Sequence, residues 1–145
     1  MEFELIALLC TAFFTSAAFY VSFVEHPARL ASGTAAALYQ WRPSYKRAAA
    51  MQIVLTILAF ISSVIAFVMT QEFTVLIGGL LLATVAPWTL IVIMPINRQL
   101  LNPSCPPDSP STQMLLDRWG QLHAVRTVIS FLALSLFAAH LLHWI

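Results

Sequence analysis

The sequence predicts an all-α integral membrane protein, a four-helix bundle in which neighbouring helices are antiparallel. Of its 145 residues, 60% are hydrophobic and only 9% are charged, and the mean hydropathy is +0.85. A soluble domain carries about 25% charged residues. Four apolar stretches are each long enough to cross the ~30 Å of bilayer hydrocarbon. We therefore expect one domain over residues 1–145, with the lipid bilayer as its principal partner.

The first two helices are expected at about 3–24 and 47–70. The first apolar run has no basic residues before it and exceeds the usual apolar core of a signal peptide, so it is expected to be retained. Pro27 is expected to end the first helix. The connection over 25–46 is expected to hold a short interfacial helix near 31–38, followed by a turn with Ser44 as N-cap of the second helix.

The last two helices are expected at about 73–101 and 111–143, joined by a linker over 102–110. Only Gln71 and Glu72 separate the second helix from the third, so these two must be antiparallel neighbours. Pro87 and Pro95 are expected to kink the third helix and to open space for a ligand. The linker is rich in proline and cannot be helical. Its end, Ser109-Pro110, fits an N-cap followed by proline at the first helical position.

The charges predict how the chain lies in the membrane. Every basic residue falls at the face that carries the 1–2 and 3–4 connections, while the other face carries Glu2, Glu4 and Glu72. The positive-inside rule then places the two long connections in the cytoplasm and both termini on the non-cytoplasmic side. No basic run is interleaved with aromatic residues, which argues against a nucleic-acid partner. The basic residues are Arg29, Arg42, Lys46, Arg47, Arg98, Arg118 and Arg126.

All four helices bring polar side chains to the same depth. From Thr127 onward, 19 residues at ~1.5 Å each span the hydrocarbon layer, so the preceding turn lies at its cytoplasmic edge. In that part of the fourth helix, Trp119, His123 and Arg126 share one face through their i, i+4, i+7 spacing. By the same counting, the other helices contribute Glu25, His26, Arg47, Gln52 and Asn97.

Such groups are costly near lipid, so they usually face the bundle interior and pair with one another. One hypothesis is a catalytic site in which His26 or His123 acts as general base while Asn97 and Arg126 stabilise an oxyanion. A second hypothesis is a metal site of Glu25, His26 and His123, with a transition metal such as iron or copper. Adjacent helical residues diverge by about 100°, so this site requires a distorted helix.

A third interpretation of the same layer is structural. Glu25 would form a salt bridge with Arg126 or Arg47 that only sets the register of the helices, or the long side chains would reach out to the membrane surface. Near the opposite face, His140 and His143 are spaced i, i+3, and we expect them to be interfacial or to face solvent.

These motifs resemble the DUF1772 family, the anthrone oxygenase-like small membrane proteins. The resemblance covers essentially the whole chain, and its specificity lies in the joint order and spacing of short motifs. These motifs are Glu25-His26-Pro27, Trp41 with Pro43 and Tyr45, Arg47 and Gln52, Pro95-Ile96-Asn97, and Trp119-x-x-x-His123-x-x-Arg126.

The resemblance implies an enzyme whose relatives include fungal oxygenases that convert an anthrone to an anthraquinone with O2. Many bacterial members have no assigned activity. Carried over to this chain, the family implies reactive residues His26, Asn97, His123 and Arg126. The residues expected to bind substrate are Trp41, Tyr45, Arg47, Gln52 and Trp119.

The leading functional hypothesis is therefore a membrane-embedded oxygenase or oxidoreductase acting on an apolar aromatic, anthrone- or quinol-like substrate at the cytoplasmic side of the bundle. Its cofactor is either a transition metal or nothing beyond O2. The alternative is a non-catalytic binding or assembly protein whose polar layer registers helices, or binds lipid headgroups or a partner subunit. Transport is a third option, and the sequence leaves a homo-oligomer open.

Overall fold

A computed structural model describes residues 1–142, so the expectations for His143 and for a helix end at 143 lie outside the described residues. The chain is helical almost throughout, and residues 1–142 contain no strand. The elements are α1 (Glu2–Tyr20), η1 (Val21–Glu25), α2 (His26–Ala31), α3 (Thr34–Thr70), α4 (Phe73–Ala83), α5 (Val85–Trp88), η2 (Thr89–Ile93), α6 (Met94–Leu101) and α7 (Pro110–Leu141), where η denotes a π-helical turn.

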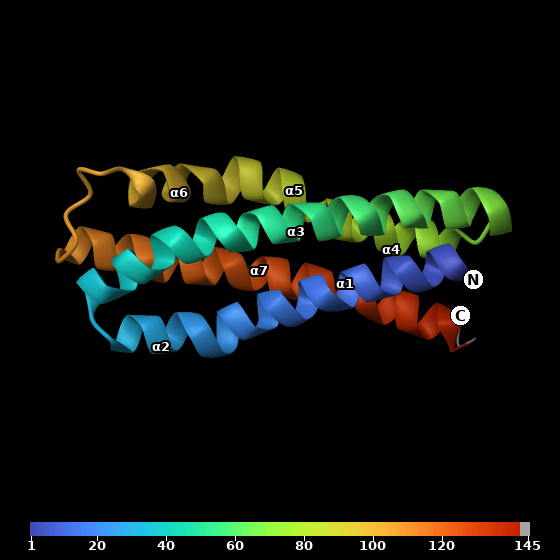
Figure 1. Ribbon diagram of the computed structural model, residues 1–145, viewed down its shortest axis with the longest axis horizontal. Helices are drawn as coiled ribbons and strands as arrows, with labels where there is room; N and C mark the ends of the chain where they lie inside the picture. Colours follow the sequence, from blue (N-terminus) through green and yellow to red (C-terminus); the bar gives the residue numbers. More distant parts are fainter. Residues whose placement is uncertain (143–145) are drawn as a thin grey trace.

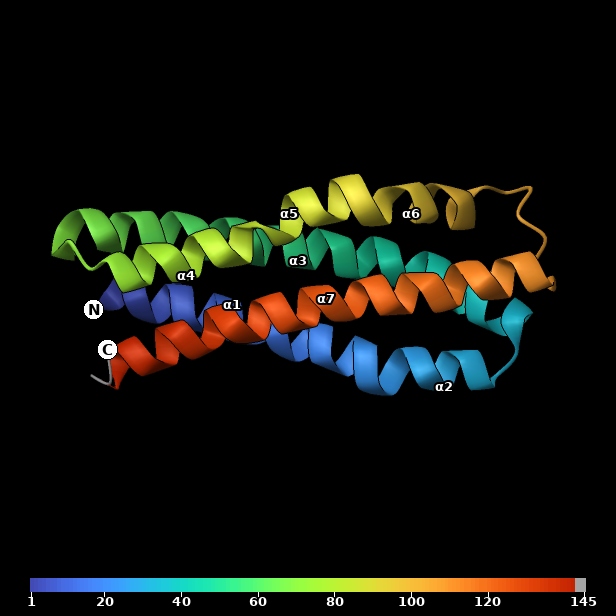
Figure 2. The ribbon, with the colours of Figure 1, turned by 180° about the vertical axis from the view of Figure 1, so that it is seen from behind.

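These elements form four spans, each long and apolar enough to cross a membrane. The first span runs from α1 to α2, the second is α3, the third runs from α4 to α6, and the fourth is α7. The first and third spans each contact both the second and the fourth. Figures 1 and 2 show the resulting up-and-down bundle, with both termini at one end. The predicted all-α architecture with four membrane helices is confirmed.

The predicted boundary between the first two helices is wrong. The first span continues to Ala31, and α3 begins at Thr34, thirteen residues before the expected start. The link is only Ser32-Gly33, where Gly33 adopts φ +91°, a conformation that glycine reaches without strain. Ser44 lies inside α3 and is not an N-cap. Tertiary packing overrides the local turn signal of Pro43 here, because Ala37, Leu38 and Trp41 in this part of α3 are fully buried.

The helices continue through Pro27, which was expected to end the first helix, and through Pro95, which was expected to kink the third. A proline ring clashes with the carbonyl four residues earlier in a regular α-helix. In this fold, each π-helical turn ends two residues before a proline, η1 before Pro27 and η2 before Pro95. The wider turn of a π-helix accommodates the missing N–H and the ring. Pro27 is therefore accommodated by a wider helical turn before it, and the first span continues past it.

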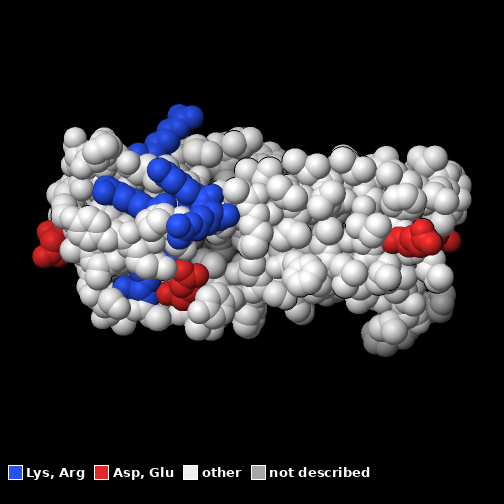
Figure 3. All heavy atoms as spheres, in the orientation of Figure 1, with Lys and Arg blue, Asp and Glu red and all other residues white. Residues whose placement is uncertain are grey.

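The bundle is longer than a membrane is thick. The uncharged part of α3, from Ala48 to Thr70, has 23 residues and covers ~34 Å, which is the hydrocarbon layer. The part before it extends the basic end of the bundle by ~20 Å. Figure 3 shows basic side chains gathered over that end, then an uncharged region, then acidic side chains at the opposite end of the face in view. The helices thus continue beyond the predicted polar layer at the basic end of the bundle, so that this layer lies inside the protein and not at its end.

The third span changes its distance from its neighbours along its length. Two glycines let α4 lie close to α3 and α7, since a Cβ on Gly79 would come within 2.5 Å of Ser63 and one on Gly78 within 3.0 Å of the Phe137 ring. The helix is then interrupted at Thr84, three residues before Pro87. Figure 2 shows α5 stepped outward from α4 at this point. The step is where the expected space for a ligand opens.

The remaining connections agree with the sequence. Gln71, with φ +59°, and Glu72 form the tight link between α3 and α4. The proline-rich segment before α7 is not helical, and Ser109 caps α7 by accepting a hydrogen bond from the backbone N–H of Thr112 at 3.2 Å. Pro110 is the first residue of that helix.

Candidate functional site

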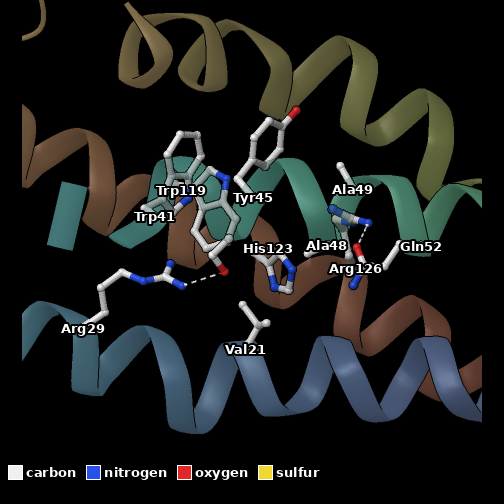
Figure 4. A pocket seen from close by; sticks show the side chains of 11 residues that line it. Val21, Arg29, Trp41, Tyr45, Ala48, Ala49, Gln52, Trp119, His123 and Arg126 are labelled. Carbon is white, nitrogen blue, oxygen red and sulfur yellow. Dashed lines mark hydrogen bonds between the residues drawn. The ribbon is translucent and has the colours of Figure 1, made fainter. Parts of the chain in front are cut away.

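A small polar cavity lies between the first, second and fourth spans, at the level where the charged part of the bundle begins. Its volume is about 20 Å³, which is room for roughly one water molecule. Figure 4 shows the side chains that converge on it from η1, α2, α3 and α7. They are Val21, Arg29, Trp41, Ser44, Tyr45, Ala48, Ala49, Gln52, Trp119, His123 and Arg126.

Arg126 brings a positive charge into this cavity. Its side chain is only 9% exposed, and its Nη2 donates to Oε1 of Gln52 at 2.7 Å. The guanidinium also lies over the ring of Phe14, 5.6 Å from the centroid. Among residues 1–142, no carboxylate is within salt-bridge distance of Arg126. A buried charge is costly without a counter-charge, so this cavity favours an anionic or strongly accepting ligand.

Arg29 is the second buried arginine, and its charge is already neutralised. Its Nη2 donates to Oε1 of Glu25 at 2.7 Å, and Gln40 and Ser44 donate to the same oxygen at 2.8 and 3.1 Å. The predicted pairing of Glu25 with Arg126 or Arg47 is therefore wrong. Glu25 instead ties α2 to α3. Glu25 and Arg29 are spaced i, i+4, which favours an ion pair between them. The sequence indicates this ion pair only if the helix continues through Pro27.

Three buried N–H groups among residues 1–142 have no acceptor. They are Nε of Arg29, Nε1 of Trp41 and Nε of Arg126, and all three residues line the cavity. Buried polar groups almost always have a hydrogen-bond partner, and exceptions in a native fold call for a ligand or water. Since all three groups are donors, the cavity is suited to a molecule that offers oxygen acceptors.

Asn97 lies behind the cavity wall and organises it. The amide is fully buried; its Oδ1 accepts from Nε1 of Trp119 at 3.0 Å, and its Nδ2 donates to the hydroxyl of Tyr45 at 3.0 Å. Because indole is a donor only, the amide orientation is fixed. The Tyr45 hydroxyl then accepts from Asn97 and keeps its own hydrogen for another partner. Asn97 thus positions two lining residues. It does not itself line the cavity, although it was predicted to act there.

His123 forms part of the cavity wall. The imidazole is 3% exposed and stacks on Trp119 with ring centroids 4.8 Å apart. Its Nδ1 lies 3.0 Å from the hydroxyl of Ser22, while Nε2 makes no hydrogen bond to the described part of the chain. In Figure 4 the ring lies between Trp119 and Arg126. The predicted i, i+4, i+7 face of α7 is therefore turned toward the cavity.

His26 has a different environment from His123. Its Nε2 donates to the carbonyl of Leu116 at 3.0 Å, and its Nδ1 accepts from Nη1 of Arg29 at 3.4 Å. The ring fits against Gly120, where a Cβ would come within 2.6 Å of it. Both ring nitrogens are engaged, and His26 does not line the cavity. The prediction of His26 as general base is not supported by this geometry.

The predicted metal ligands do not converge. Glu25 turns to α3 while its neighbour His26 turns to α7, the divergence expected of adjacent helical residues. Within residues 1–142, no three His, Cys, Asp or Glu side chains are grouped so that they could hold a metal ion. At the other end of the bundle, His140 lies 3.7 Å from Glu4. It therefore faces α1 and is mostly buried, and its expected position at the membrane interface stays a prediction.

A larger apolar groove adjoins the polar cavity. Its volume is about 300 Å³, at the lower end of the range for small-molecule sites. Exposed Ile53, Ile57 and Leu90 lie at its rim, on the apolar outer surface of the bundle. The other lining residues are Phe14, Tyr45, Ala49, Gln52, Thr56, Val85, Ala86, Thr89, Met94 and Arg126. Tyr45, Ala49, Gln52 and Arg126 line both spaces, so the polar cavity and the groove adjoin at these four residues.

The structure thus divides the predicted site residues into three groups. Those that line the cavity are Trp41, Tyr45, Gln52, Trp119, His123 and Arg126. Glu25, His26 and Asn97 support the lining residues from behind. Arg47 is exposed and lines neither space, so its predicted role in substrate binding is not supported. The sequence did not reveal Arg29, Ser44 or Ser22, because their role depends on the unexpected helical path around Pro27.

Comparison with known protein families shows what this chain is similar to. The model of the family described as anthrone oxygenase matches residues 41–136. This range begins at Trp41 and contains every cavity-lining residue of α3 and α7, whereas Glu25 and His26 precede it. No curated protein and no solved structure matches the chain.

Proposed function

The chain belongs to the anthrone oxygenase family and is an integral membrane protein, and from this premise we propose that it is an oxygenase of a flat apolar aromatic substrate. The substrate class is an anthrone or a related oxygen-bearing ring system with an acidic C–H or O–H group. Its rings occupy the apolar groove, and its oxygen reaches Arg126. His123 takes the proton.

The junction of the two spaces is the observation that carries this proposal. An apolar groove of about 300 Å³ ends at Tyr45, Gln52 and Arg126, which offer hydrogen-bond donors and one uncompensated positive charge. A molecule with apolar rings and one polar oxygen matches this distribution. Donors aimed at a developing negative charge in a water-poor site are the largest common source of catalysis.

The proposed reaction balances with O2 as the only co-substrate. Nε2 of His123 lies in the wall of the polar cavity and not of the groove, so the proposal requires the edge of the central ring to lie at the junction of the two spaces. There Nε2 accepts a proton from the methylene carbon, and the electron pair forms an enolate whose oxygen is held by Arg126 and Tyr45. The enolate carbon reduces O2 and forms a C–O bond, and the peroxide takes the proton back from His123. Loss of water then leaves a second carbonyl. One oxygen atom stays in the product and the other leaves as water with the two methylene hydrogens.

The orientation in the membrane is part of the proposal. All seven basic residues of the chain lie at the end of the bundle opposite the termini, so we place that end in the cytoplasm by the positive-inside rule. The groove then opens within the hydrocarbon layer, and an apolar substrate dissolved in the bilayer has a direct route to it.

The test is oxygen uptake by the purified protein in detergent with an anthrone, corrected for oxidation without protein. We expect His123→Ala and Arg126→Gln each to lower the turnover by about 100-fold or more. Arg47→Gln is the matched control, because it also removes an arginine at this depth but one that is exposed, and it should retain wild-type turnover. If His123→Ala equals the wild type across anthrones and quinols while both remain folded, the proposal is wrong.

A further inference from the structure

A chain of hydrogen bonds between the first and fourth spans, through Thr127 and Ser22, ends at His123. We propose that Ser22 and Thr127 are positioning residues that hold His123 in the tautomer with hydrogen on Nδ1, so that Nε2 is the unprotonated nitrogen. The value of this tautomer for catalysis rests on the proposed function. The tautomer itself is a property of the folded protein and is measurable without turnover.

Three hydrogen bonds connect the imidazole to the backbone of α1. Oγ1 of Thr127 lies 3.1 Å from the carbonyl oxygen of Ala18. Oγ of Ser22 lies 2.9 Å from Oγ1 of Thr127 and 3.0 Å from Nδ1 of His123. Thr127 is 5% exposed and His123 is 3% exposed, so bulk water does not compete for these two groups, and Ser22 between them is partly buried. Ser22 lies in the π-helical turn η1, a type of distortion that is frequent at functional sites.

Counting hydrogens fixes the direction of this chain. A carbonyl only accepts, and each hydroxyl has a single hydrogen. Thr127 must therefore give its hydrogen to Ala18, which leaves Ser22 as the donor in the bond between the two hydroxyls. Ser22 then has no hydrogen left for His123, so Nδ1–H of His123 donates to Ser22. All three bonds exist together only in this arrangement, and a neutral imidazole with hydrogen on Nδ1 carries a lone pair on Nε2.

The consequence for the site is that the free base is Nε2. This nitrogen makes no hydrogen bond to residues 1–142, and the imidazole lines the polar cavity. Ser22 and Thr127 do not line that cavity, so they act on the reaction only through His123. His26 shows the opposite pattern, because its Nε2 faces the carbonyl of Leu116 at 3.0 Å and must carry hydrogen there. The two buried histidines are thus expected to be opposite tautomers.

The experiment is ¹⁵N-histidine NMR of the purified protein in detergent micelles at neutral pH, with correlations that distinguish the two neutral tautomers. The His123 and His26 signals are assigned by their loss in His123→Ala and His26→Ala. We expect the wild type to show His123 with hydrogen on Nδ1 and His26 with hydrogen on Nε2. A wild-type His123 with hydrogen on Nε2 would overturn the proposal.

Two variants test the cause. Thr127→Val removes the hydroxyl that orients Ser22, so the Ser22 hydrogen becomes available to Nδ1, and we expect a substantial fraction of the Nε2–H tautomer at His123. Thr127→Ser keeps the hydroxyl and should restore the wild-type pattern. The matched control is Thr15→Val, which also removes a hydroxyl-to-carbonyl bond between α1 and α7, from Thr15 to Ser130 at 3.1 Å, and should leave His123 unchanged. An unchanged tautomer in Thr127→Val would contradict the proposed role of Thr127.

Turnover with an anthrone separates this inference from the proposed function. If both hold, Thr127→Val lowers kcat by about twofold to tenfold with little change in KM, because only the fraction with a free Nε2 reacts, and Thr15→Val does not. If the wild type shows no turnover with any anthrone or quinol, the proposed function fails while the tautomer result still stands. If Thr127→Val changes the tautomer of His123 but keeps the wild-type kcat, Ser22 and Thr127 have no role in catalysis.

Discussion

At the scale of single residues, the hydroxyl of Tyr45 offers a donor at the junction of groove and cavity because Asn97 already donates to its oxygen at 3.0 Å. We predict that Tyr45→Phe lowers the free energy of unfolding by about 0.5–1.5 kcal/mol, since one hydrogen bond is lost. Substrate affinity should fall by about tenfold, as expected for a donated hydrogen bond. Chemical unfolding and equilibrium binding of an anthrone without oxygen, both in detergent, measure the two effects. Unchanged binding in a folded variant would argue against the donor role.

Gly120 gives a second prediction at this scale. Replacing an ordinary helical glycine by alanine stabilises a helix by about 1 kcal/mol. At Gly120 the added Cβ would lie 2.6 Å from the ring of His26, so we expect Gly120→Ala to destabilise the protein by about 1–3 kcal/mol. Ser135→Ala, an exposed change on the same helix, should have little effect. Thermal unfolding in detergent measures both, and a stabilised Gly120→Ala protein would show that His26 does not pack there.

Spacing in the sequence predicts best those relations between residues that are local. Trp119, His123 and Arg126 share one face of a single helix, and that spacing is rigid. The roles of His26 and Asn97 were not predictable, because they depend on which neighbouring span each side chain meets. That choice is set by the rotation of the spans about their axes, which no local spacing determines.

At the scale of elements, the interruption of the third span at Thr84 is what leaves room for the groove. We predict that Pro87→Ala lets α4 and α5 join into one regular helix, because it restores a backbone donor and removes a ring clash. The variant should bind an anthraquinone at least about tenfold more weakly while its thermal stability is unchanged or higher.

Pro43→Ala is the matched control for this prediction. Pro43 is also an exposed proline inside a membrane helix, but it does not line the groove, so its replacement should leave binding unchanged. Equal binding by Pro87→Ala and the wild type would mean that the groove does not depend on the break.

The prolines also show what sequence patterns predict about elements. Pro87 was expected to distort the third span and does, and Ser109-Pro110 begins α7 as expected. Pro27 and Pro43 were expected to mark a helix end and a turn, yet both lie within helices. The π-helical turn before Pro27 and the burial of Trp41, two residues before Pro43, compensate for the lost hydrogen bonds. Both compensations come from tertiary packing, which a local motif does not reveal.

At the scale of the whole molecule, the separation of charge predicts the orientation in the membrane. In a background with Cys10→Ala and Cys105→Ser, we predict that Gln71→Cys in intact cells reacts with a membrane-impermeant maleimide. Ser104→Cys should react only after the membrane is permeabilised, since it lies at the basic end. Both positions are exposed in the structure. Labelling of Ser104→Cys alone in intact cells would invert the proposed topology.

We propose that the whole molecule binds its aromatic substrate as an oxyanion, formed by His123 and held by Arg126. The most direct measurement is the absorption spectrum of an anthrone bound to the purified protein without oxygen, because an enolate absorbs at longer wavelength than the neutral ketone. We predict that the wild type at saturation shows the long-wavelength band and that His123→Ala and Arg126→Gln show much less of it. A wild-type complex with only the spectrum of the neutral ketone would contradict this account.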